Sequence, residues 1–297
     1  MGVTIYSFMR LSCVFMEKGK IGVQMMMLKE EIRRGGMRPA MEKLADLGYH
    51  AVEVSQIPMT PENIRELQYA DQNLGIQTVS MSCGLEDLSP DYKYPGDTLA
   101  NDFNKIVEDC QAVNCGILRI GMLPLHSAVS PEKMMEMIQR CEEYAAALKT
   151  HGIDFYYHAH TMEFYRWKGK PVLTHMKEQT KVLGFELDSH WMWRGGVDPV
   201  SYIRSFQGRV RLLHLKDYRI GLISDPTHMS LDIFGPLEEY AEVGEGCLDM
   251  PAIIQAGLES GSEYFLIEQD NQYGRNVYDS LRISRDNLIK MGYADWF

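Results

Sequence analysis

The stretch SPEKMMEMIQRCEEYAAALKTHGIDFYYHAH, residues 130–160, joins a helix to a strand and decides the fold. Ser130, followed by a proline, is typical of a helix N-cap. Apolar residues then recur at helical spacing as far as Gly152, and IDFYYHAH (153–160) is a strand candidate. A long helix that leads directly into a buried strand is half of a β/α repeat, so the sequence predicts parallel strands.

The same alternation runs along the whole chain. We predict eight strands, each followed by a helical pattern, at 21–28, 49–55, 76–83, 115–123, 153–160, 183–191, 210–218 and 262–270. Eight such units in 297 residues predict a single (β/α)₈ TIM barrel. A doubly wound sheet in two domains is the alternative, but KEEIRRGGMRP, after the first strand, lacks the GxGxxG spacing of a phosphate turn.

The barrel domain is predicted over 21–297, with 1–20 as an N-terminal extension. The segment 221–248 is the longest without clear periodicity, which makes it a candidate active-site lid. The start is broken by charged residues and has no small-residue cleavage site, so we expect no signal peptide. The six cysteines include no CxxC pair and are predicted to be reduced thiols of a cytoplasmic protein.

Charge and hydropathy exclude two classes of partner. The formal net charge of −11 opposes binding to a phosphate backbone, so no nucleic-acid partner is expected. No apolar run reaches the ~18 residues that a transmembrane helix needs, so no membrane span is expected.

Ionisable side chains gather where the predicted strands end, the edge at which barrels carry their chemistry. Taken singly, each is more simply a helix cap or a hydrogen-bonded structural residue. Together they are costly in a buried rim unless a cation compensates them. Carboxylates with imidazoles suit Mn²⁺, Mg²⁺, Co²⁺ or Zn²⁺. The residues concerned are Glu53, His158, His160, Glu163, Asp188, His190, His214, Lys216, Asp217, Glu268 and Asp270.

Five segments in order resemble the xylose-isomerase-like barrels, the sugar phosphate isomerase/epimerase superfamily that shares its fold with endonuclease IV. They are GYHAVEVS, YYHAHTMEF, LDSHWMWRGGVDP, HLKD, and GEGCLDMPAIIQAG with YFLIEQD. YYHAHTMEF is similar to the YHNHxxEF signature of one branch, and LDSHWMWRGGVDP to its DTYW…GGxDP segment. The resemblance spans residues 21–293.

The resemblance implies one divalent metal, with Mn²⁺ as the first choice and Mg²⁺, Co²⁺ or Zn²⁺ as alternatives. Carried over by position, three ligands are Asp188, His214 and Glu268. Many members have a glutamate where this chain has His158, and the resemblance offers Glu163 as the replacement ligand.

The histidines of the predicted fifth strand are then free for proton transfer. His158 and His160 face the same side of that strand because side chains alternate with period two. We predict one of them as general base, with His158 favoured, and Lys216 or His190 as the residue that orients the substrate oxygens.

The predicted function is a divalent-metal-dependent isomerase or epimerase that acts on a keto sugar or sugar derivative through an enediolate. The alternative is a lyase that cleaves 3-keto C-glycosides by β-elimination, as the resemblance to C-glycoside deglycosidase large subunits implies. An endonuclease IV-like phosphodiesterase and a non-catalytic binding barrel are the further alternatives. Besides the sugar or glycoside substrate, we expect self-association into a homo-oligomer or a complex with a small second subunit.

Overall fold

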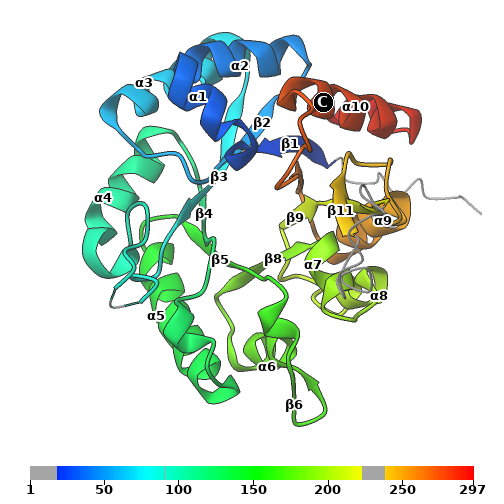
Figure 1. Ribbon diagram of the computed structural model, residues 1–297. Coiled ribbons are helices and arrows are strands. Elements are labelled where there is room, and N and C mark those ends of the chain that lie inside the picture. Colours follow the sequence, from blue (N-terminus) through cyan, green and yellow to red (C-terminus); the bar gives the residue numbers. More distant parts are fainter. Residues whose placement is uncertain (1–18, 90, 223–237) are drawn as a thin grey trace, which may run out of the picture.

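The predicted barrel is confirmed by the computed structural model, which describes residues 19–89, 91–222 and 238–297. Eight parallel strands close in the order β1-β12-β9-β8-β5-β4-β3-β2, with helices around them (Figure 1). The barrel strands are β1 (Lys20–Gln24), β2 (Ala51–Val54), β3 (Gln77–Cys83), β4 (Ile117–Ile120), β5 (Asp154–His158), β8 (Gly184–Asp188), β9 (Leu212–Leu215) and β12 (Tyr264–Ile267).

Helices follow every barrel strand. They are α1 (Lys29–Gly35) and α2 (Met37–Asp46) after β1, α3 (Pro61–Tyr69) after β2, α4 (Leu99–Ala112) after β3, α5 (Pro131–Lys149) after β4, α6 (Val172–Gln179) after β5, α7 (Ser189–Arg194) and α8 (Pro199–Arg204) after β8, α9 (Met250–Ser260) after β9, and α10 (Val277–Lys290) after β12. The predicted cap forms: Ser130 accepts from the Lys133 amide at 3.2 Å. Thr60 caps α3 in the same way and accepts from the Asn63 amide at 3.2 Å. Of the described helices, none is both long enough and apolar enough to cross a membrane.

Seven of the eight barrel strands end earlier than the sequence predicts, and at two of them a polar side chain shows why. β1 stops at Gln24, whose side chain accepts from the Met26 amide at 2.5 Å and opens the short 3₁₀ helix η1 (Met25–Leu28). β8 stops at Asp188, whose carboxylate caps α7. In both cases a polar side chain turns the backbone just after the buried strand, and apolar residues beyond it continue as helix.

The inside of the barrel is divided along its axis. Six buried residues close the amino-terminal end: Ala51, Val79, Ile117, Tyr156, Leu212 and Leu266. Gly184 belongs to this floor, since a Cβ there would lie 2.2 Å from the Tyr156 ring. The next inward positions toward the carboxyl end carry charge instead, beginning with Glu53, Arg119 and Glu186.

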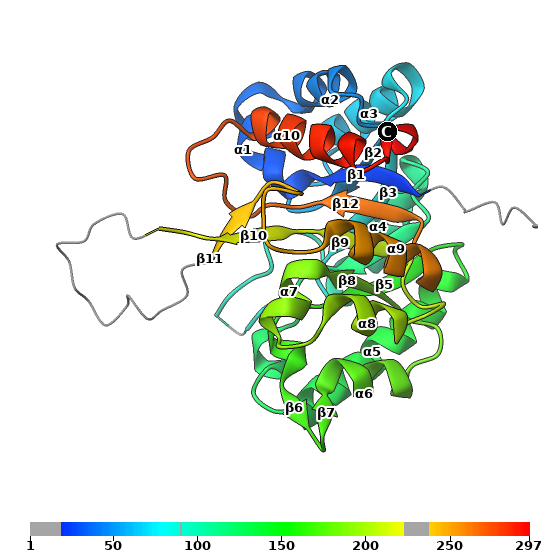
Figure 2. The same ribbon diagram turned by 90° about the vertical axis from the view of Figure 1, so that its right-hand side faces the viewer.

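Two small antiparallel pairs lie outside the barrel sheet. β6 (Arg166–Trp167) pairs with β7 (Lys170–Pro171), and β10 (Asp217–Ile220) pairs with β11 (Glu238–Ala241). Figure 2 shows β10 and β11 projecting beyond the barrel. Because β10 follows β9 directly, this hairpin stands at the carboxyl end of the strands.

Candidate metal centre

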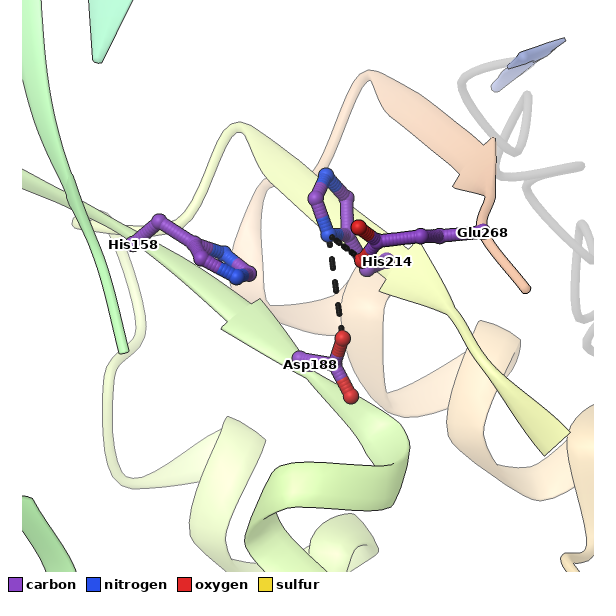
Figure 3. A group of neighbouring side chains, drawn as sticks. All are labelled: His158, Asp188, His214 and Glu268. Atoms are coloured by element: carbon purple, nitrogen blue, oxygen red, sulfur yellow. Dashed lines mark ion pairs between the residues drawn. The ribbon is translucent and has the colours of Figure 1, made fainter. Parts of the chain in front are cut away.

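Four side chains converge at the carboxyl end of the barrel. His158 ends β5, Asp188 ends β8, His214 lies in β9 and Glu268 follows β12. One nitrogen or oxygen of each lies within 4.8 Å of the others, and all four residues are buried. Figure 3 shows them around a common centre. We call these four residues the rim cluster.

In each carboxylate of the rim cluster, one oxygen accepts hydrogen bonds and the other oxygen accepts none from the described residues. Asp188 Oδ1 accepts from two backbone N–H groups of α7, at 2.8 and 3.0 Å. Glu268 Oε1 accepts from Gln24 Nε2 at 2.9 Å. The remaining oxygens face His214 Nδ1, at 3.7 Å for Asp188 Oδ2 and 2.8 Å for Glu268 Oε2. The hydrogen bonds to the first oxygen of each carboxylate therefore orient its second oxygen toward His214 Nδ1.

A divalent cation fits this arrangement. Among the described residues, Asp188 Oδ2, Glu268 Oε2 and His214 Nδ1 are buried and have no partner with hydrogen-bond geometry. Buried polar atoms without partners are rare in folded proteins, and a bound ion is one explanation for them. Two carboxylates with two imidazoles are ligands that Mn²⁺, Co²⁺ and Zn²⁺ accept, whereas Mg²⁺ prefers oxygen.

Lys216 lies beside the same two carboxylates. Its Nζ is 3.1 Å from Glu268 Oε2, 3.6 Å from Asp188 Oδ2 and 3.0 Å from Asp270 Oδ1, and 4.6 Å from the centre of the Trp191 ring. Burial opposes the charge, but these carboxylates raise the pKa of Lys216 above its ordinary value. Lys216 is therefore an ammonium that reaches the edge of the rim cluster, where it can orient a substrate oxygen.

A second layer of buried charge lies next to the rim cluster. Glu53 Oε1 is 3.1 Å from His214 Nε2, and Glu186 lies 3.2 Å from both His214 Nε2 and His158 Nδ1. Arg119 Nε donates to Glu53 Oε1 at 3.0 Å and forms an ion pair with Glu186 Oε2 at 2.9 Å. Burial acts against it, yet these carboxylates, with Glu268, raise the pKa of His214 well above its usual value.

His160 lies beside the rim cluster rather than in it. Its ring is 4.6 Å from the His158 ring and 5.5 Å from the Trp191 ring, between centroids. Burial and the neighbouring His158 lower the pKa of His160 to about 3, so its imidazole is neutral at pH 7. The lowered pKa keeps the imidazole unprotonated and also makes it a weaker base than an ordinary histidine.

Glu163 lies elsewhere, although the sequence suggested it as a metal ligand. It is fully buried in the 3₁₀ helix η4 (Met162–Phe164), and burial raises its pKa. Oε1 accepts from the Tyr157 hydroxyl at 2.5 Å, and Oε2 accepts from the His160 amide at 3.0 Å. Tyr157 is next to His158 in the strand and so faces the other side of the sheet. The rim cluster contains His158 at the strand-five position and does not contain Glu163.

His190 is surrounded by aromatic rings. Its ring centroid lies 4.8 Å from that of Trp191, 5.8 Å from Trp193, 5.7 Å from Tyr218 and 5.2 Å from Tyr240. Burial lowers the pKa of His190 to about 4. It does not belong to the rim cluster or to the cavity described next.

A cavity of about 460 Å³ opens onto this centre. Its polar wall includes His158, His160, Lys216 and Glu268. The apolar residues in its lining include Met26, Leu88, Met122 and Trp191. Most of the predicted lid, residues 223–237, lies outside the described part of the chain. Of its described part, Tyr240 in β11 places its ring 5.5 Å from Lys216 Nζ.

Sequence reasoning missed three residues of the centre, Gln24, Arg119 and Glu186. Each is a polar side chain inside a run that is otherwise a buried strand, as in CGILRIGML and LGFELD. Such a residue at an inward position must have a buried partner. A polar residue inside a buried strand is therefore a usable signal in the sequence, whereas the predictions above rest on residues near the strand ends.

The sequence pattern described as "Xylose isomerase-like TIM barrel" matches residues 41–288 of this chain. No curated protein matches it significantly. A solved structure of a sugar phosphate isomerase/epimerase from Parabacteroides distasonis is similar, with a TM-score of 0.71 and 20% identity over 93% of this chain and 99% of that one.

Two further structures share the fold. The probable 3-DHS dehydratase AsbF, involved in petrobactin synthesis, from Bacillus anthracis has a TM-score of 0.65 and 14% identity over 91% of this chain and 98% of that one. The IolI protein with a binding zinc atom has a TM-score of 0.65 and 12% identity, over 94% and 99%. At these identities the likeness is one of fold.

Proposed function

Since the chain belongs to the xylose isomerase-like TIM barrel family, we propose that it is a divalent-metal-dependent isomerase or epimerase. Its substrate is a keto sugar or sugar derivative, and the reaction passes through an enediolate. The observation that carries this proposal is the rim cluster, in which two buried carboxylate oxygens and His214 Nδ1 face one point without hydrogen-bond partners.

We assign His158, Asp188, His214 and Glu268 as the residues that hold the metal, with Mn²⁺ as the first candidate. When bound, the metal supplies Lewis acidity to the carbonyl and the neighbouring hydroxyl of the substrate. Glu163, the ligand that the sequence suggested, is the competing fourth residue. A carboxylate there would have to give up its bonds to Tyr157 and the His160 amide.

His160 is then the candidate base. It borders the cavity and lies beside the metal ligands without belonging to them. In this assignment His160 takes the proton from the carbon next to the carbonyl. Lys216, held by three carboxylates, donates to a substrate oxygen and fixes its position.

The test follows deuterium uptake by NMR in D₂O, with free ketoses and 3-keto glucosides in the presence of Mn²⁺. His160→Ala is expected to keep its metal and lose about 10²–10⁴ in exchange rate, because a positioned base contributes about that much. His151→Ala, a change at an exposed histidine on the barrel's outside, is the matched control. Unchanged exchange in His160→Ala would exclude His160 as the base.

A lyase that eliminates a β-substituent from the same enediolate is the second candidate. The apolar wall of the cavity, with Met26, Leu88 and Met122, supports it because an aglycone would need such a surface. A small second subunit belongs to this alternative. In the same NMR experiment, a 3-keto glycoside that releases its aglycone instead of exchanging deuterium identifies the lyase.

A phosphodiesterase with several metals is disfavoured by one contact. Glu53, Glu186 and His214 form a second group with metal-ligand geometry. Arg119 already forms ion pairs with both glutamates of that group. A guanidinium in this place supplies the compensating charge that a further metal would bring.

A further inference from the structure

The layer of Glu53, Arg119 and Glu186 is not explained by metal binding itself. None of the three belongs to the rim cluster, yet all are buried and they contact both of its histidines. Charged groups taken out of water are costly, so an arrangement of this kind needs a reason.

The two histidines meet this layer through different ring nitrogens. His214 is bonded at Nε2, 3.1 Å from Glu53 Oε1 and 3.2 Å from Glu186 Oε1, and its Nδ1 faces the rim carboxylates. His158 meets the layer at Nδ1, which lies at an ion-pair distance of 3.2 Å from Glu186 Oε2, although the two atoms lack full hydrogen-bond geometry. The nitrogen left for a metal is thus Nδ1 in His214 and Nε2 in His158.

Resting on the proposed function, we propose that Glu53 and Glu186 are positioning residues that fix the two ligand histidines in opposite tautomers. His214 donates Nε2–H to Glu53 and binds the metal through Nδ1. His158 donates Nδ1–H to Glu186 and binds through Nε2. A carboxylate that accepts the second N–H of a ligand imidazole both orients the ring and makes it a better donor.

Arg119 holds the carboxylates of Glu53 and Glu186 in place. Its guanidinium contacts Glu53 and Glu186 from β4, while the histidines approach from β5 and β9. The planar fork of an arginine suits two acceptors at once, and a lysine would supply one point charge instead. Arg119 also takes the place that a second cation would need between the two glutamates.

The test uses Zn²⁺, which is diamagnetic, with protein labelled with ¹⁵N in its histidines. At one equivalent of Zn²⁺, long-range ¹H–¹⁵N correlation spectra should show two zinc-responsive histidines, one protonated at Nε2 and the other at Nδ1. The Glu53→Gln variant should perturb the first of these signals, and Glu186→Gln should perturb both. Two zinc-bound histidines with the same tautomer would overturn the proposal while leaving the proposed function standing.

Zinc affinity, measured by chelator competition, gives a second readout. Glu53→Gln and Glu186→Gln are each expected to weaken binding by about 10–100-fold, the usual cost of losing such a partner. The control is Glu242→Gln, which alters another buried, ion-paired glutamate, bonded to Ser280 and Arg275 away from the rim. An equal loss of zinc affinity in all three variants would show that Glu53 and Glu186 have only a structural role and would contradict the proposal. Failure of the wild-type protein to bind Zn²⁺ would overturn both the inference and the proposed function.

Discussion

Asp188 shows how one residue can serve the fold and the site together. Its Oδ1 caps α7 and its Oδ2 points into the rim cluster. The resemblance implied Asp188, His214 and Glu268 as ligands of one metal, and the structure brings them together. It also groups His158 with them, a role the sequence left to Glu163. Spacing along the chain could not decide between His158 and Glu163 as the ligand. His158 ends the strand and Glu163 follows it, and the directions of their side chains depend on the turn between them.

Glu163→Gln separates the two assignments. With His158 as the ligand, the variant keeps one metal per chain after dialysis, measured by elemental analysis. Its deuterium exchange falls, by up to about 100-fold, because the loop that carries His160 loses an anchoring carboxylate.

Asp188→Ala is the comparison for this variant and is expected to lose the metal. If Glu163→Gln loses its metal to the same extent, then Glu163 is a ligand, as the sequence suggested.

At the scale of elements, the sequence predicted the eight strands but not where most of them stop or how the segment after β9 turns. Periodicity reports which face of an element is buried, and SHWMWR is as apolar as the strand before it. The end of β8 is set by a side-chain cap, which depends on three-dimensional geometry. Likewise, periodicity does not indicate that Lys216 and Asp217 are both buried. Lys216 contacts the rim carboxylate of Glu268, whereas Asp217 accepts from backbone amides beyond β11.

Asp217 organises the turn that follows β11. Its two oxygens accept from the amides of Tyr218, Gly244, Gly246 and Leu248, at 2.9–3.2 Å. A Cβ at position 246 would lie 2.2 Å from Asp217 Oδ1, which explains the glycine there.

Asp217→Ala should therefore lower the free energy of unfolding by about 1–3 kcal/mol, because several amides lose their acceptor. The measurement is urea unfolding followed by circular dichroism. Asp217→Asn, which retains one acceptor oxygen, should lose less. Equal midpoints for wild type and Asp217→Ala would show that the turn does not depend on this side chain.

On the scale of the whole molecule, the barrel has an apolar floor and a charged upper half. The barrel itself followed from counting β/α units, because a closed parallel sheet of eight strands is the arrangement that buries so many regular repeats. Of the charged residues in the upper half, the sequence predicted only those near the strand ends. Five carboxylates there, on Glu53, Glu186, Asp188, Glu268 and Asp270, face the two cations Arg119 and Lys216. This excess of negative charge at the open end of the barrel is what a divalent cation would balance.

The most direct test is an anomalous diffraction measurement on crystals grown with Mn²⁺. The account predicts one peak per chain, bonded to His158, Asp188, His214 and Glu268 at distances of about 2.0–2.3 Å. His214 should bind through Nδ1. A peak bonded to Glu163 in place of His158 would contradict the ligand assignment. The absence of any peak at the rim cluster, with Mn²⁺ present in excess, would contradict the central claim that this barrel is a metal-dependent enzyme.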